Sequence, residues 1–153
     1  MLTTIFLLIA LALGVLISLQ PAINTAVADR LGNPLMAATF SIAISLVLLV
    51  MAWISIGKFD GQWSKISSLP WWVLIGGASG AFFVAGGVMI APRVGVATFF
   101  VFIVAGQLIG AAVADHFGAF GMIERSISAP RLIGILLVVA GAALVQSSGE
   151  TNP

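Results

Sequence analysis

The sequence predicts an all-α polytopic membrane protein that crosses the bilayer five times. Hydrophobic residues make up 61% of the 153 residues and charged residues only 7%, whereas a soluble domain carries about 25% charged residues. Apolar stretches of roughly 20 residues match the length that a helix needs to span a hydrocarbon core of about 30 Å. Five such stretches occupy most of the chain, so we expect residues 1–147 to form one transmembrane domain.

The first two predicted spans meet at a tight turn. The first span covers residues 2–28, and at 1.5 Å per residue it is about 40 Å long, so we expect it to tilt or protrude. The segment 32–34, Gly-Asn-Pro, then reverses the chain, and its proline suits the first turn of the next helix. The second span covers residues 35–56, and residues 57–70 form the longest polar loop.

The remaining spans are predicted at residues 71–91, 94–115 and 129–146, with a polar tail at 148–153. Trp71 and Trp72 open the third span at the depth expected of an aromatic belt. The fifth span has an apolar run of only 14 residues, 132–145. It can cross the bilayer if Arg131 extends its side chain to the membrane surface.

An odd number of spans places the two chain ends on opposite sides of the membrane, and it gives the chain the size of one half of an inverted-repeat transporter. The lysines and arginines of the N-terminal side are Lys58, Lys65, Arg125 and Arg131, and those of the other side are Arg30 and Arg93. This bias is slight under the positive-inside rule. A single orientation with the N-terminus inside and insertion in both orientations are therefore both open.

Two amides lie inside the first predicted span. Gln20 and Asn24 are four residues apart, so they share one face of a helix. Pro21 lies between them and has no backbone N–H, which leaves the carbonyl of Ile17 without its usual donor. A bent helix with a free carbonyl beside two amides can bind a small solute. The alternative is that the amides bond to neighbouring helices, at about 0.6 kcal/mol for an average bond.

Other polar side chains at depth are candidates for the same role. Gln107 lies in the fourth span on a face of small residues, where it can contact a solute or a neighbouring helix. Ser41 and Ser45 of the second span are again four residues apart. For these two serines, hydrogen bonding within the helix is the favoured interpretation, since a serine can bond back to its own backbone.

Asp115 and His116 are an acid and the one histidine, adjacent to each other at the end of the fourth span. They can either carry a coupling proton or cap the helix at the membrane interface, and their position favours the cap. No acid lies deep in any predicted span, which disfavours a proton exchanger built around a central carboxylate.

Small residues recur at helical spacing in the last three spans. The pairs are Gly76 and Gly80, Gly106 and Gly110, and Gly134 and Gly141. Such faces let helices approach closely, either within one bundle, which is the favoured interpretation, or against a partner chain.

The composition excludes several classes of function. The chain has no cysteine, one histidine and none of the usual hydrolase, nucleotide-binding or metal-binding motifs. We therefore expect no enzymatic activity, no cofactor and no metal site. A net charge of +1 also argues against a nucleic-acid partner.

Several of these residues form a known pattern. In this order the chain contains Gln20-Pro21-x-x-Asn24, Gly106-Gln107, Asp115-His116-Phe117-Gly118-x-Phe120-Gly121, and Arg131-Leu132-x-Gly134 with Gly141. The pattern resembles the YdcZ-type family of small membrane proteins in the drug/metabolite transporter superfamily. The resemblance covers essentially the whole chain, and its most specific part is the Asp-His-Phe-Gly stretch.

The resemblance implies a multi-pass protein of the bacterial inner membrane whose five helices equal one half of a ten-helix transporter. In that superfamily the halves are inverted repeats, and five-helix members of this family are thought to pair with an oppositely inserted copy or a paralogue. It also implies that the amides of the first and fourth spans lie near the pathway. Related small multidrug exporters carry an essential glutamate where this chain has Gln20 and Asn24, which puts proton-coupled export of cations in doubt.

Taken together, these features predict a secondary transporter of a small polar or weakly charged solute, working in the lipid bilayer as an antiparallel homodimer or as a heterodimer with a paralogue. The substrate-binding residues would be Gln20, Asn24, Gln107, Ser41 and Ser45. The alternative is a non-transporting membrane subunit that stabilises or regulates a partner membrane protein.

Overall fold

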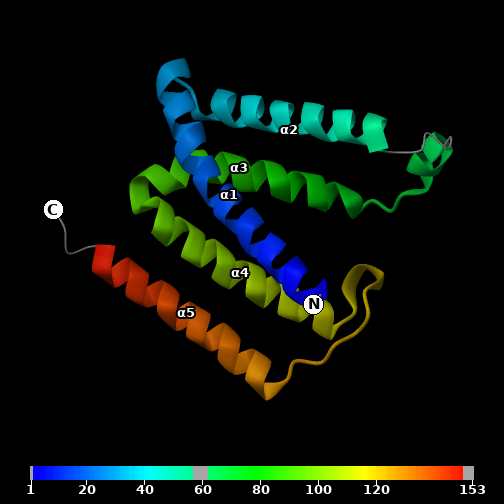
Figure 1. Ribbon diagram of the computed structural model, residues 1–153, viewed down its shortest axis with the longest axis vertical. Helices are drawn as coiled ribbons and strands as arrows, with labels where there is room; N and C mark the ends of the chain where they lie inside the picture. The colour runs from blue at the N-terminus through cyan, green and yellow to red at the C-terminus, as the bar shows by residue number, and fades with distance from the viewer. Residues whose placement is uncertain (1, 57–61, 150–153) are drawn as a thin grey trace. The chain divides into compact units, whose positions relative to one another are not determined.

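The computed structural model describes residues 2–56 and 62–149, and this part of the chain folds into five long α-helices and two short 3-10 helices (Figure 1). All five long helices are long and apolar enough to cross a membrane, so the predicted fold class is confirmed. Lys58, which entered the charge count above, lies outside the described residues. The chain divides at Pro92 into two compact units, which are described in turn.

In the first unit, a turn joins helix α1, Leu2–Leu31, to helix α2, Pro34–Ile56. Gly32 takes a φ of 69°, a left-handed conformation that a residue without a Cβ adopts at little cost. The Asn33 side chain then caps α2, because its Oδ1 accepts the backbone N–H of Leu35 at 2.9 Å and of Met36 at 3.1 Å. Pro34 is the first residue of α2, as the sequence predicts.

The third helix of this unit is α3, Val73–Val94, preceded by the 3-10 helix η1, Gln62–Ser68. The core of the unit lies where the end of α1, the start of α2 and the second half of α3 meet. It consists of Ala28, Ala37, Ala38 and Val88. Three of these four side chains are alanines, which allow the helices to approach closely.

The second unit is a helical hairpin in which α4, Val96–His116, packs beside α5, Ala129–Gly149 (Figure 1). The 3-10 helix η2, Ala119–Gly121, lies in the connector between them. With 21 residues, α5 is about 31 Å long, so this helix is as long as a hydrocarbon core is thick and extends past the predicted end at residue 146. Its first turn is closed by a hydrogen bond from Leu132 N–H to the carbonyl of Ser128 at 3.0 Å.

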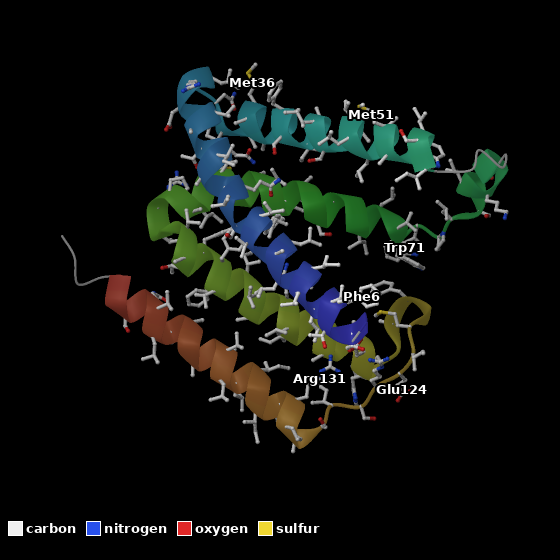
Figure 2. All side chains as sticks on the ribbon, in the orientation of Figure 1. Phe6, Met36, Met51, Trp71, Glu124 and Arg131 are labelled. Carbon is white, nitrogen blue, oxygen red and sulfur yellow. The ribbon has the colours of Figure 1, made fainter. Side chains whose placement is uncertain are left out.

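Large apolar side chains are exposed along all five long helices. Figure 2 shows two of them, Met36 and Met51, pointing away from α2, and both are more than half exposed. Continuous apolar surface on this scale marks contact with lipid or with another protein. It accounts for the small core, since in a bilayer the lipid covers the surfaces that a soluble protein would have to bury.

Candidate functional site

One face of α1 is buried, and it carries the polar side chain of Asn24. Pro21, Asn24 and Ala28 are the buried residues of this helix, and their spacing of three and four places them on one face. Asn24 is only 5% exposed, and it is the one buried polar residue in the part of the chain that the structure describes. Gln20, one turn earlier, is half-buried, so both predicted amides lie at or beside this face.

The Nδ2 atom of Asn24 has no hydrogen-bond partner among the described residues, and neither does the hydroxyl oxygen of Thr25, the next residue. Burying such a group without a partner costs about 1–3 kcal/mol. More than nine in ten buried polar groups in native proteins are paired with protein or water. Two adjacent unpaired groups on one apolar helix therefore indicate a position where a solute or a water molecule can form the missing hydrogen bonds.

Several other hydroxyl groups in the spans donate hydrogen bonds within their own helices. Ser18 donates to the carbonyl of Val15 at 2.8 Å and Thr39 donates to the carbonyl of Leu35 at 2.8 Å. In α2, the Ser45 hydroxyl donates to the carbonyl of Ser41 at 3.1 Å. Ser45 therefore bonds within its own helix, as the favoured interpretation of the serine pair predicts. The contrast sets Thr25 apart from these residues.

Pro21 removes the usual hydrogen-bond donor of a backbone carbonyl beside Asn24. The helix continues through the proline, but the ring nitrogen has no hydrogen to give to the carbonyl of Ile17, one turn earlier. Ile17, Pro21 and Asn24 share a face by their spacing. Figure 1 shows α1 changing direction along its length, and a proline inside a helix is a common cause of such a bend.

In the second unit, Gln107 lies near the middle of α4 and is exposed. The buried small residues of the α4–α5 hairpin are Ala105, Ala112 and Ala142. At 3.6 residues per turn, Gln107 lies on the opposite side of α4 from Ala105 and Ala112. An amide at this depth in a span is costly to leave in hydrocarbon, so this face requires a covering surface or a polar solute.

The glycine pairs predicted to pack helices are all open. A Cβ added at any of Gly76, Gly80, Gly106, Gly110, Gly134 or Gly141 would meet no atom within 4 Å. Packing at these positions stays a prediction, and a partner chain could supply the atoms that it needs.

Asp115 is held where α4 ends. Its Oδ2 accepts a hydrogen bond from the guanidinium of Arg131 at 2.6 Å, with both side chains about one-third exposed. Its carbonyl oxygen accepts the backbone N–H of Arg125 at 2.7 Å and of Gly118 at 3.3 Å. The carboxylate and the carbonyl of one residue thus tie the connector and the start of α5 to the end of α4, and Figure 2 shows where Arg131 lies on α5.

This arrangement favours the interface role of Asp115 over proton carriage, because the carboxylate is already engaged. The His116 ring packs edge-on against Phe117, with ring centroids 4.9 Å apart, and its Nδ1 is buried with no partner among the described residues. Sequence reasoning expected Arg131 only to extend to the surface and missed the ion pair. The signal in the sequence was two opposite charges at the two ends of one connector.

Metal binding gains no support from the described residues, which include no group of three or more histidine or acidic side chains close enough to hold an ion. The polar groups inside the spans are amides and hydroxyls. The fold defines a multi-pass membrane protein, and the buried face of α1 is its candidate hydrogen-bonding site.

The chain belongs to the family described as "Putative inner membrane exporter, YdcZ", whose model matches residues 5–144. It is 33% identical over 143 residues to the inner membrane protein YdcZ of Escherichia coli (strain K12), in an alignment that covers 93% of each chain. No solved structure matches it. The family resemblance and the location, a multi-pass inner-membrane protein, are therefore confirmed. The family description names an exporter and not an enzyme, which supports a role in membrane transport.

Proposed function

We propose that this protein is a secondary transporter of a small polar or weakly charged solute and that it works as an antiparallel homodimer. The observation that carries the proposal is the buried Nδ2 of Asn24, which has no partner among the described residues. A buried polar group without a hydrogen bond costs free energy, so a solute that bonds to it is favoured at that position. The family description, an exporter, supports the same class of function.

The solute contacts in this proposal come from Gln20 and Asn24 of α1 and from Gln107 of α4. Ser41 and Ser45 of α2 are secondary candidates for solute contact, because the hydroxyl of Ser45 already donates a hydrogen bond within its own helix. Few polar groups and no central carboxylate suit a solute that is recognised by hydrogen bonds rather than by charge.

In this proposal, a second copy inserted in the opposite orientation supplies the second repeat of the transporter. Inverted-repeat transporters place their site near the membrane midplane, at the interface of two repeats, and five spans without internal duplication make one repeat. The exposed Gln107 and the open Gly106 and Gly110 beside it form a face on α4 that such a copy can cover.

Flux through proteoliposomes tests the transport proposal. Vesicles that contain the protein should take up small polar probes such as urea, acetamide and glycerol, measured by light scattering as they swell. Asn24→Ala and Gln107→Ala should each abolish this flux while the dimer persists on cross-linking. Ser18→Ala is the matched control, because its hydroxyl bonds only to its own helix in the described structure. Full flux in both amide variants would overturn the site assignment, and no flux of any probe would favour the non-transporting subunit.

Labelling of single cysteines tests the antiparallel assembly, and the chain has no cysteine of its own. Ser67→Cys lies before α3, and Leu31→Cys lies at the end of α1, across the membrane from it if α2 spans. An impermeant maleimide applied to intact cells and then to inverted vesicles should label each position from both sides. Labelling of each position from one side only would end the antiparallel homodimer and leave a parallel assembly or another partner.

A further inference from the structure

We infer that the site on α1 takes an electrically neutral solute that presents a hydrogen-bond acceptor, such as a carbonyl or hydroxyl oxygen, to Asn24 and Thr25. This inference rests on the proposed function, and it names the chemical class of the substrate at the same site. Two observations support the inference: the hydrogen-bonding role of the unpaired polar atoms, and the positions of the charged residues along the chain.

The unpaired side-chain groups are donors. Asn24 Nδ2 carries two N–H groups and has no acceptor role, whereas the hydroxyl of Thr25 has one O–H to give and can also accept a hydrogen bond. Both atoms are buried and unpartnered within the described residues. A solute that bonds to Asn24 Nδ2 must therefore offer lone pairs, and a solute whose polar atoms are all donors, such as an alkylammonium ion, leaves this atom unpaired.

The backbone of α1 offers a hydrogen-bond acceptor on the same face as Asn24. The carbonyl of Ile17 loses its usual donor because Pro21 has no N–H, and Ile17 lies seven residues, or two turns, before Asn24. A solute with an acceptor for Asn24 and a donor for this carbonyl would satisfy both. Amides, ureas and polyols carry the two kinds of group close together.

Charge decides between neutral and ionic solutes. Among the described residues, the acidic and basic side chains of the apolar helices lie in a first or last turn, and the others lie in the connections between these helices. In α1 the charged residues are Asp29 and Arg30, one turn or more past Asn24. Removing an ion from water costs several kcal/mol unless an opposite charge compensates. Asp115, the acid at the end of α4, is already paired with Arg131. A second copy has the same sequence and adds no charge at depth.

Side-chain amide NMR tests this inference with small probe molecules in place of the natural substrate. The sequence has three asparagines, Asn24, Asn33 and Asn152, so protein labelled with ¹⁵N-asparagine in nanodiscs gives three pairs of side-chain signals. Asn24→Asp assigns the pair that belongs to Asn24. The probes are two matched pairs of nearly equal shape, urea with guanidinium and acetamide with acetate.

Urea and acetamide should shift the Asn24 signals, while guanidinium and acetate should leave them in place. Thr25→Val should weaken the binding of both neutral probes by about threefold to tenfold, the loss of one hydrogen bond. Asn33 is the internal control, because its oxygen is already engaged at the start of α2. Ser18→Ala, on the same helix, should bind the probes as the unchanged protein does.

Two results would overturn the inference: a response of the Asn24 signals to a charged probe but not to its neutral partner, or no response to either neutral probe. Flux of the same four probes separates this from the proposed function. Binding of urea without flux would leave the ligand class standing and remove transport. Flux of guanidinium or acetate that Asn24→Ala abolishes would leave transport standing and remove the neutral class.

Discussion

Replacement of Asn24 by leucine should stabilise the fold and abolish transport. The two side chains have similar volume, and Asn24 is 5% exposed with an unpartnered Nδ2 among the described residues. Leucine removes the cost of that unpaired donor, about 1–3 kcal/mol. If Asn24 instead joined helices by a hydrogen bond in the resting protein, its loss would destabilise the fold by about 0.6 kcal/mol on average. The two roles predict opposite signs.

Reversible unfolding in mixed micelles, followed by circular dichroism while the SDS fraction rises, measures this change. Asn24→Leu should shift the midpoint to a higher SDS fraction, and Ser18→Ala, on the same helix, should leave it within about 0.5 kcal/mol of the unchanged protein. A lower midpoint for Asn24→Leu would refute the reasoning, because it would mean that the amide is paired in the resting protein.

Three further predictions use the same unfolding measurement. Asn33→Ala should destabilise the protein by about 0.5–2 kcal/mol, because it removes the N-cap of α2; no change would show that the turn holds without the cap. Gly118→Ala should cost about 1–2 kcal/mol, since Gly118 has a φ of 56° and a Cβ there would lie 3.0 Å from the carbonyl oxygen of Met122; a neutral result would contradict this backbone conformation. A double-mutant cycle of Asp115→Ala and Arg131→Ala should give a coupling of only about 0.2–1 kcal/mol, because both side chains are about one-third exposed; a much larger value would place the pair away from water.

The fold could be predicted from the sequence because apolar length is a simple signal. Each of the five stretches is bounded by turn residues or charges, and the turn at 32–34 has a proline where a helix can begin. The sequence predicts a short fifth span, because its apolar run lies between Arg131 and Gln146. The predicted span starts at residue 129, and α5 begins at Ala129 in the structure, so Arg131 belongs to its first turn, where the guanidinium reaches Asp115.

The candidate site could be predicted only in part. Spacing alone places Gln20 and Asn24 on one face, and the chemistry of proline removes the usual donor to the carbonyl of Ile17. Spacing does not say which of the two amides is buried, since this depends on where the small residues of α1, α2 and α3 meet. Thr25 was missed, because a threonine in a helix usually bonds to its own backbone, and only the structure shows that this one does not.

Asn24 and Gln107 need different partners, so the proposed site can fail at one of these residues without failing at the other. Asn24 is buried and unpaired among the described residues, so a small molecule or water is the group that can reach it. Gln107 is exposed in the middle of a span, so it requires a whole surface, which a second chain can provide. A solute site at Asn24 could therefore survive the loss of the antiparallel homodimer. The assignment of Gln107 to the same site could not, since nothing but the second copy is proposed to cover its face.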